Sequence, residues 1–329
     1  MIQFQLVGNY MDYILITTPD ENEWNALVAT SPQGTIFSDT NFLGATNVPY
    51  TCYLVKAQHG ETLAGVVVME DGDSMHVAPC AYALYHGILF SHSVSVRPSL
   101  KRVTSEFRLT EYLIHALYGI YGNFSMALSP NFTDLRPFLW HNYDETNLPR
   151  FVISNRYTAT LDLSDFSLDN YLKNIRKVRR QEFKKTTAEI TETKDLALFL
   201  DLYVKTFERQ DIVVSQQQLE LVTGIVTSAL ANRFGRLSMA TTTEGVASMS
   251  LFVYDSHSAY YLMGVNNPEI RKGGASTALM IDNICAMAKL GLSKLDFVGV
   301  NSPNRGDYKL SFSPVLKPYY EVHLDRTSN

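Results

Sequence analysis

The chain has 329 residues, of which 46% are hydrophobic and 12% aromatic, enough apolar side chains to fill the cores of two domains. A formal net charge of −5 argues against broad, sequence-independent binding to nucleic acid, and we expect no DNA partner. The apolar runs are far shorter than the roughly 20 residues of a membrane-spanning helix, and the first residues lack a cleavable leader pattern. We therefore expect a folded cytoplasmic protein with no membrane span.

Cysteine and histidine residues give no sign of a metal site or a disulfide framework. The three cysteines are widely spaced and odd in number, which is typical of buried small side chains. The eight histidines show neither HExxH nor HxH spacing. The sequence therefore predicts no metal.

The first half of the chain contains a hairpin pattern followed by a strand, a helix and a strand. Two strand-like runs in residues 51–70 flank a turn at His59-Gly60-Glu61. The run YALYHGILFS, residues 82–91, predicts the third strand. A helical pattern runs from about Leu100 to Gly122 and is followed by a short strand, FSMALS.

The second half repeats this order. Residues 236–255 form a hairpin pattern around Glu244-Gly245, followed by the strand AYYLMGV, a helix from about Thr277 to Leu290, and the strand KLDFVGV, residues 294–300. Agreement over successive elements indicates an internal duplication. Between the halves, a strand over residues 157–163 precedes a helix beginning near Ser167 or Asp169. We place the domain boundary near Pro149, giving domains 1–149 and 150–329.

A basic run, KNIRKVRRQEFKK from Lys173 to Lys185, stands out in this acidic chain because it carries seven basic residues against the single acid Glu182. Arginine guanidinium groups match phosphate and carboxylate oxygens in geometry, so the run is a candidate anion site. The alternative is a solvated helix face.

A glycine-containing turn, NNPEIRKGGAST, joins the predicted strand of residues 260–265 to the following helix. Its glycines would let backbone N–H groups approach a pyrophosphate, and the N-terminus of the helix would add favourable partial charge. The alternative is a turn that only connects a strand to a helix.

Four segments together resemble the FemAB-like acyltransferases, relatives of the GNAT N-acetyltransferases built from two GNAT-like domains. They are RYTATLDLS, LKNIRKVRRQEFKK, the stretch from YYLMGVNNPEIRKGGAST to KLDFVGV, and DYKLSFSPVLKPYYEV. The resemblance covers roughly Tyr157 to Val322 well and is weaker in the first half. It implies an α/β (α+β) fold of two GNAT-like domains, each a mixed, mostly antiparallel twisted sheet flanked by helices, and an activity that transfers an acyl or aminoacyl group onto an amine.

The resemblance also points to site residues. The turn occupies the place of the GNAT phosphate-binding loop, although Ser276 stands where the family has glycine or alanine. Ser313 likewise replaces the final glycine of the family's second motif, in which the lysine faces the active site. Candidate cofactor-binding residues are Arg271, Gly273, Gly274 and Ser276; candidate substrate-binding residues are Arg176, Arg179, Arg180 and Phe312.

Direct attack by an amine needs a stabilised oxyanion and a neutralised leaving group but no covalent nucleophile, and the sequence has no GxSxG elbow. Lys309 is the candidate for the positive charge, with a solvated surface lysine as its alternative. Asp296 is a candidate general base, with Asp307 as the alternative, and backbone groups beside the strand carrying Tyr261 are candidates for orienting the amine.

The expected co-substrate is acyl-CoA or aminoacyl-tRNA, with no tightly bound cofactor. The expected partners are an amine-bearing small molecule, peptide or lipid-linked acceptor and, for the second donor, the 3′ end of a tRNA; a role in peptidoglycan or cell-envelope biosynthesis fits this chemistry. The alternative function is a catalytically silent GNAT-fold binding protein, a reading motivated by Ser276 and Ser313 at positions where the family favours glycine.

Overall fold

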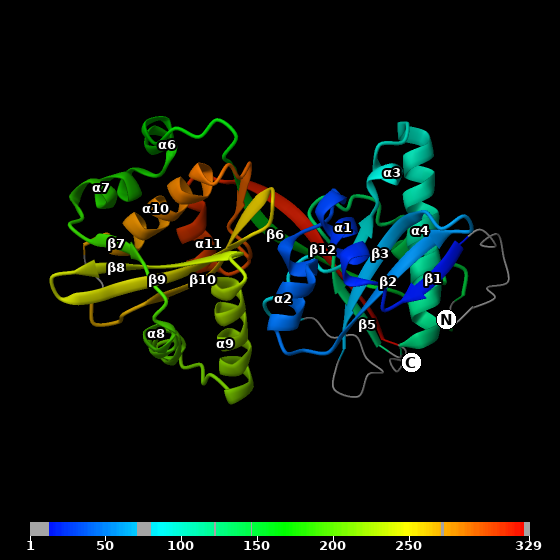
Figure 1. Cartoon of the computed structure of the whole chain (residues 1–329), viewed down its shortest axis with the longest axis horizontal. Helices are drawn as coiled ribbons and strands as arrows, with labels where there is room; N and C mark the ends of the chain where they lie inside the picture. Colours follow the sequence, from blue (N-terminus) through cyan, green and yellow to red (C-terminus); the bar gives the residue numbers. More distant parts are fainter. Residues whose placement is uncertain (1–12, 71–79, 122, 146, 271–272, 326–329) are drawn as a thin grey trace. The chain divides into compact units, whose positions relative to one another are not determined.

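The computed structural model describes residues 13–70, 80–121, 123–145, 147–270 and 273–325 (Figure 1). The chain divides into two compact units: unit 1 consists of Met1–Arg156 and Pro318–Asn329, and unit 2 of Tyr157–Lys317. Strands β6 (Val152–Asp162) and β12 (Val315–Asp325) each cross this division along the chain. We retain domains 1–149 and 150–329 as a proposal for the organisation of the sequence.

Unit 1 contains an antiparallel sheet in the order β1-β2-β3-β4. The inner strand β3 is buried along nearly its whole length. Alternate side chains of a strand point to opposite sides, so both faces of β3 are covered. Val66 and Val68 pack in the same core cluster as Leu113 of helix α4, whereas Gly65 lies against Trp24 of helix α1. The elements of this sheet and its two helices are β1 (Tyr13–Thr17), β2 (Tyr50–Ala57), β3 (Thr62–Met69), β4 (Ile88–Phe90), α1 (Glu21–Thr30) and α4 (Ser99–Ile120).

The hairpin of β2 and β3 and the helix α4 confirm the sequence prediction for this half, but the predicted strand of residues 82–91 is too long. Only β4, residues 88–90, pairs with β3. Tyr85 has a φ of 55°, which interrupts extended backbone just before β4. The remaining elements of unit 1 are η1 (Ile36–Ser38), α2 (Thr40–Ala45), α3 (His92–Ser95), β5 (Asn123–Ala127) and α5 (Arg136–Trp140); β5 pairs antiparallel with the end of β12.

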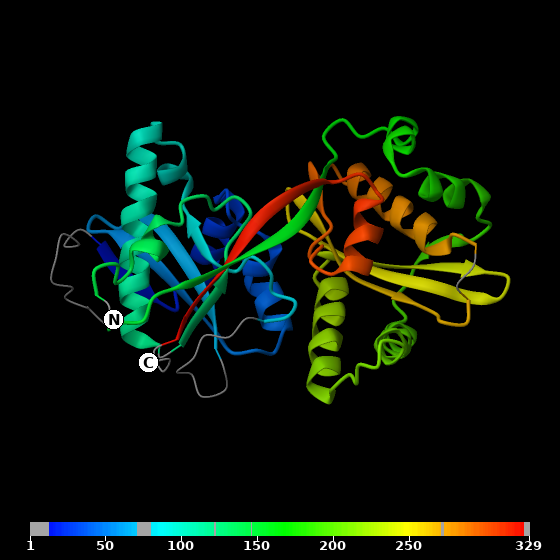
Figure 2. The same ribbon diagram turned by 180° about the vertical axis from the view of Figure 1, so that it is seen from behind.

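Unit 2 contains a sheet in the order β6-β11-β10-β9-β8-β7. Neighbouring strands in this order are antiparallel except β10 and β11, which are parallel and are connected by helix α10. Figures 1 and 2 show α10 and α7 on one face of the sheet and α8 and α9 on the other. The strands are β7 (Glu189–Glu192), β8 (Gly235–Thr242), β9 (Gly245–Tyr254), β10 (Ser258–Asn266) and β11 (Lys294–Asp296); the helices are α6 (Leu168–Asn174), α7 (Lys177–Lys185), α8 (Leu196–Glu208), α9 (Gln216–Ala231), α10 (Ala275–Lys289) and α11 (Pro303–Leu310).

Helix α10 buries one face against the sheet because its apolar residues recur at helical spacing. Ile281, Ile284 and Met287 are fully buried in the cluster that also contains Phe252 of β9. The predicted mixed α/β architecture, with sheets flanked by helices, is confirmed. None of the described helices combines the length and apolar character needed to cross a membrane.

Candidate functional site

The parallel strands β10 and β11 part after three paired positions, and this parting forms the centre of the candidate site. Their register runs from Ser258 beside Lys294 to Tyr260 beside Asp296. Beyond Asp296 the predicted strand KLDFVGV does not continue, because Val298 and Gly299 have φ values of 38° and 56°. A positive φ is strained for a β-branched residue such as valine, and strain of this kind tends to occur at functional positions.

Lys309, on α11, places its ammonium group at this parting. Its Nζ donates to the carbonyl oxygen of Val298 and, at 3.2 Å, to that of Gly299. The same Nζ lies 5.3 Å from the centroid of the Tyr261 ring, a cation–π distance. Burial lowers the pKa of Lys309 to about 8, against the opposing charge of Asp296. The group is therefore mostly protonated at neutral pH and can stabilise negative charge.

Asp296 fixes the backbone that binds Lys309. Its carboxylate is 2% exposed and accepts hydrogen bonds from Thr158 Oγ1 at 2.5 Å and from the Val298 N–H at 2.8 Å. Burial raises its pKa. These contacts give Asp296 a positioning role for the segment after β11, while its role as general base stays a prediction.

Tyr261 folds back over its own strand. A β-bulge lies between Tyr261 and Met263, and the phenol hydroxyl occupies the space where a side chain at Gly264 would begin. The ring also packs 5.2 Å from that of Phe252. Burial raises the pKa of the phenol, which therefore stays neutral and can donate a hydrogen bond.

The predicted phosphate-binding turn leads into α10, but α7 packs directly on it. Gly274, at the N-cap position, has a φ of 74°, and a Cβ there would lie 2.9 Å from the carbonyl oxygen of Glu182. Gly273 has a φ of 108°, and Ser276 accepts a hydrogen bond on its carbonyl from the Tyr308 hydroxyl at 3.1 Å. Arg271 lies outside the described residues.

Glu182 places a carboxylate at the first turn of α10. Its Oε2 accepts hydrogen bonds from Thr277 Oγ1 at 2.6 Å and from Arg179 Nη1 at 2.7 Å. Helix N-termini attract anions, so this helix already has an anion of its own. The single acid in the basic run marked this position in the sequence, although its role was not predicted.

The three predicted arginines are each bound within unit 2. Arg176 makes two 2.8 Å hydrogen bonds to Asp307, and Arg180 donates to the carbonyls of Leu172 and Lys173 at the end of α6. The basic run is not one helix, because α6 ends at Asn174 and α7 begins at Lys177.

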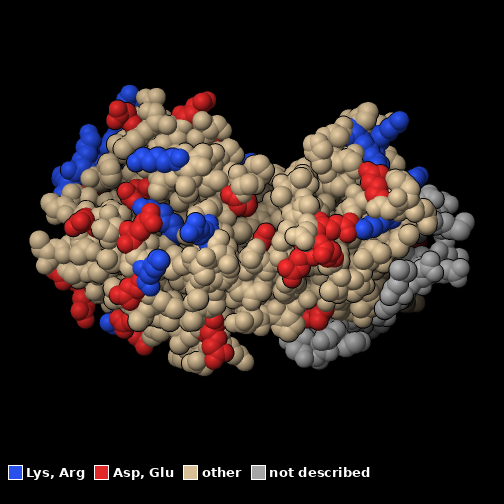
Figure 3. Space-filling model, viewed as in Figure 1, with Lys and Arg blue, Asp and Glu red and all other residues tan. Residues whose placement is uncertain are grey.

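Arg179 is more buried than Arg176. It donates to Ser311 Oγ at 2.8 Å, and its guanidinium carbon lies 4.7 Å from the centroid of the Tyr308 ring. Figure 3 shows Lys and Arg side chains mixed with Asp and Glu over unit 2 on the face in view. Arg179 therefore connects α7 to α10 and α11, and a substrate-binding role for the three arginines stays a prediction.

Phe312 is fully buried. Its ring stacks 6.2 Å from that of Phe297 and meets the ring of Tyr308 edge to face at 5.2 Å. This burial gives Phe312 a packing role in the core of unit 2 and argues against direct contact with substrate. Among the residues that the structure describes, no group of three or more His, Cys, Asp or Glu side chains is placed to hold a metal ion.

Comparisons with known proteins define the class. Residues 169–310 match the family model described as an acetyltransferase (GNAT) domain. A tandem GNAT protein from the clavulanic acid biosynthesis pathway has a TM-score of 0.53 at 12% identity, over 96% of this chain and 100% of that one. A comparison with curated proteins finds no match. The chain has the tandem GNAT fold.

Within that class the likeness extends to FemX, with a TM-score of 0.64 at 11% identity over 94% of this chain and 97% of FemX. The C-terminal domain of a putative lysylphosphatidylglycerol synthetase from Agrobacterium fabrum has a TM-score of 0.53 at 11% identity, over 92% of this chain and 91% of that one. The predicted FemAB-like fold is confirmed. The match to the acetyltransferase (GNAT) domain model supports acyl transfer in general.

Proposed function

We propose that the protein is an N-acyltransferase that moves an acyl or aminoacyl group from an activated donor onto an amine by direct attack. The neutral amine forms a C–N bond to the donor carbonyl, the C–O or C–S bond breaks, and the proton lost by the nitrogen replaces the acyl group on the leaving oxygen or sulfur. The observation that carries this proposal is the Lys309 ammonium at the parting of β10 and β11. A fixed cation there stabilises the oxyanion of the tetrahedral intermediate.

Two further residues have proposed roles around Lys309. The Tyr261 hydroxyl, kept neutral by burial, is a donor that can orient the incoming amine or the carbonyl oxygen. Asp296 holds the Val298 N–H and so keeps the carbonyl that binds Lys309 in place. Its raised pKa also suits a group that accepts a proton from the attacking nitrogen.

The carboxylate of Glu182 favours an aminoacyl ester over acyl-CoA as the donor. A pyrophosphate approaching the first turn of α10 would meet this negative charge, and α7 packs against Gly274 on the same turn. We therefore propose the aminoacyl ester at a tRNA 3′ end as the donor. Acyl-CoA is the second candidate, because α10 has no side-chain N-cap and two glycines of positive φ precede it.

The proposed acceptor is an amine on a small molecule, a peptide or a lipid-linked precursor, and the proposed setting is cytoplasmic biosynthesis of the cell envelope. The names of the similar structures support this choice, since one is FemX and another a putative lysylphosphatidylglycerol synthetase. No tightly bound cofactor is proposed, because both donors arrive already activated.

Removal of the acyl group from the donor is the reaction that tests this proposal. Purified protein is incubated with a mixture of charged tRNAs and, separately, with acetyl-CoA, each in the presence of a panel of amines, and the loss of ester or the appearance of free thiol is followed. We expect loss of the ester, and we expect Lys309→Ala to slow this loss by about 100-fold while Lys289→Ala, at an exposed lysine on α10, does not.

Two other results would favour the alternatives. Thiol release sensitive to Lys309→Ala would make acyl-CoA the donor and contradict the argument from Glu182. Saturating coenzyme A would then also stabilise the protein by about 2.7 kcal/mol at 100 times its dissociation constant. Release of neither donor would contradict the proposed activity and favour the silent binding protein.

A further inference from the structure

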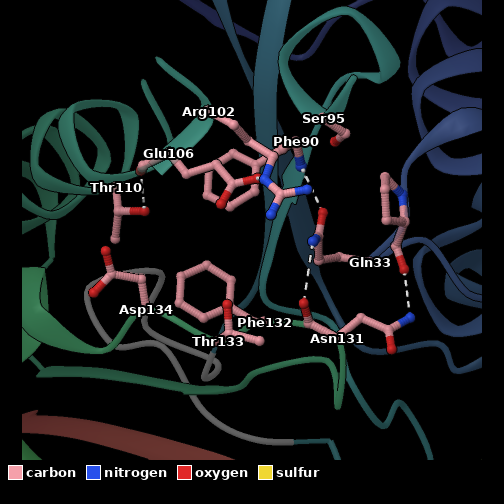
Figure 4. A pocket seen from close by; sticks show the side chains of 11 residues that line it. Gln33, Phe90, Ser95, Arg102, Glu106, Thr110, Asn131, Phe132, Thr133 and Asp134 are labelled. Carbon is pink, nitrogen blue, oxygen red and sulfur yellow. Dashed lines mark hydrogen bonds and ion pairs between the residues drawn. The ribbon is translucent and has the colours of Figure 1, made fainter. Parts of the chain in front are cut away.

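Unit 1 contains a cavity of about 190 Å³ beside the end of β4 (Figure 4). Its walls come from the segment after α1, from β4 and α4, and from the segment after β5. The residues used in the argument are Gln33, Phe90, Arg102, Glu106, Asn131 and Asp134. None of them has a part in the proposed transfer reaction.

The cavity lies beside a close contact between the residue that precedes β4 and the end of β5. The Gly87 N–H donates to the Ala127 carbonyl at 3.1 Å, and a Cβ at Gly87 would lie 2.9 Å from the side chain of Leu128. Glycine is therefore required for the close approach at this point. Beyond it, β4 pairs with β3 on its other side, and among the described residues β4 and β5 form no strand pairing.

Gln33 spans the gap and holds it open. Its Oε1 accepts a hydrogen bond from the Phe90 N–H at 3.2 Å, and its Nε2 donates to the Asn131 carbonyl at 3.3 Å, as Figure 4 shows. The side chain is buried, so these two bonds replace the pairing that a continuous sheet would supply. The cavity is thus a built feature of unit 1.

Glu106 is the carboxylate in this cavity with unused hydrogen-bonding capacity. Its side chain is only 15% exposed, and its ion partner is Arg102, whose Nε lies 4.0 Å away, beyond hydrogen-bond distance. No other described side chain donates to it. Asp134 differs, because Arg136 binds it through two side-chain hydrogen bonds of 2.6 and 2.8 Å. Burial raises the pKa of Glu106, because a carboxylate that loses water without gaining hydrogen-bond donors is destabilised in its charged form.

The remaining walls restrict the ligand. Arg102 is 45% exposed and lies one helical turn from Glu106, so it can bind an anion close to the cation that Glu106 requires. The rings of Phe90 and Phe132 stack 5.6 Å apart and offer an apolar surface beside both charges. A phosphate or a dicarboxylate would be repelled by Glu106 and Asp134.

We propose that this cavity binds a small α-amino acid, with its ammonium at Glu106, its carboxylate at Arg102 and its side chain against Phe90 and Phe132. A zwitterion is the ligand class that satisfies both charges in a space of this size. The site is separate from Lys309 and does not rest on the proposed transfer activity.

Calorimetric titration of the full chain tests the proposal. Each of the twenty standard L-amino acids is titrated at millimolar concentration, and for L-alanine the matched compounds propionate and ethylamine remove the ammonium or the carboxylate. We expect at least one amino acid to bind and its one-charge analogues to bind at least about tenfold more weakly, because each loses a charge-assisted hydrogen bond. Binding of none of the twenty would overturn the proposal.

Variants locate the binding. Glu106→Gln and Arg102→Gln should each weaken the affinity for the amino acid by about tenfold or more. The matched controls Glu145→Gln and Lys101→Gln, which remove a negative and a positive charge from exposed residues of unit 1, should not. Removing the underused charge should leave the melting temperature of Glu106→Gln unchanged or raised, so a folding defect is not expected. Affinity that survives Glu106→Gln but is lost in Lys309→Ala would place the ligand in unit 2 and contradict the assignment.

Discussion

The space beyond the end of β4 in unit 1 is bridged by the neutral amide of Gln33, whereas the space beyond Asp296 in unit 2 receives the ammonium of Lys309. Along the chain, α3 and α4 lie between β4 and β5 in unit 1, and α10 lies between β10 and β11 in unit 2. Among the described residues, the contact is one hydrogen bond, from Gly87 to Ala127, in unit 1 and three paired positions in unit 2. In each unit, therefore, one side chain lies just beyond a short contact between two segments. That side chain decides the chemistry there, because an amide completes hydrogen bonds while an ammonium group also stabilises developing negative charge.

Removing the charge from unit 2 should have the largest effect. We expect Lys309→Ala to lower turnover by about 100-fold, the loss measured when one fixed oxyanion donor is removed, with the folded state retained. Steady-state transfer rates and thermal unfolding measure the two effects, and Lys289→Ala is the control. A rate close to that of the wild type would exclude Lys309 from the mechanism.

Removing the bridge from unit 1 should affect stability instead. Gln33→Ala leaves the buried N–H of Phe90 without its acceptor, which costs about 1–3 kcal/mol of unfolding free energy. Chemical denaturation measures the loss, and the same substitution at the exposed Gln217 should change stability little. If Gln33→Ala abolished transfer without lowering the free energy of unfolding, the contrast between a structural Gln33 and a catalytic Lys309 would be wrong.

The pH dependence of the transfer rate should distinguish the contribution of the Lys309 ammonium from that of other titrating groups. Because burial lowers the pKa of Lys309 to about 8, the wild type loses this charge as pH rises through that value. Lys309→Arg keeps its charge at all these pH values. The ratio of wild-type to Lys309→Arg rates should therefore fall by about tenfold from pH 7 to pH 9, and a constant ratio would contradict a role for the protonated amine.

The smallest effect is expected at Ser313, which follows the buried Phe312 and has a φ of 62°. The resemblance placed glycine at this position, and the left-handed conformation explains why, since a Cβ is disfavoured there by about 1–2 kcal/mol. Allowing for the greater flexibility of the unfolded chain, Ser313→Gly should stabilise the protein by up to about 1 kcal/mol. Unfolding that is unchanged or easier would show that serine is accommodated without strain, and a gain in activity would connect this turn to Lys309.

Local sequence patterns predicted much of the fold. Strand alternation and a glycine turn predicted the hairpin of β8 and β9, and helical spacing predicted α10 to within two residues at its start and one at its end. Two strands were predicted too long, in residues 82–91 and 294–300. In both, apolar residues continue past the point where the backbone turns to positive φ, at Tyr85 and at Val298. Hydrophobicity alone does not report such a turn.

The sequence by itself determined the repeated order of helices and strands, because that order depends on periodicity and on short motifs. The resemblance singled out Lys309, whose role stays a prediction. Only the tertiary structure decided that Arg179 joins three helices, that Phe312 is buried, and that Glu182 lies at the first turn of α10. The partners of Glu182 and Glu106 come from how helices pack and how strands part. The sign of a charged residue in a sequence shows which kind of group it can bind. The fold decides whether another side chain of the same protein already occupies that residue.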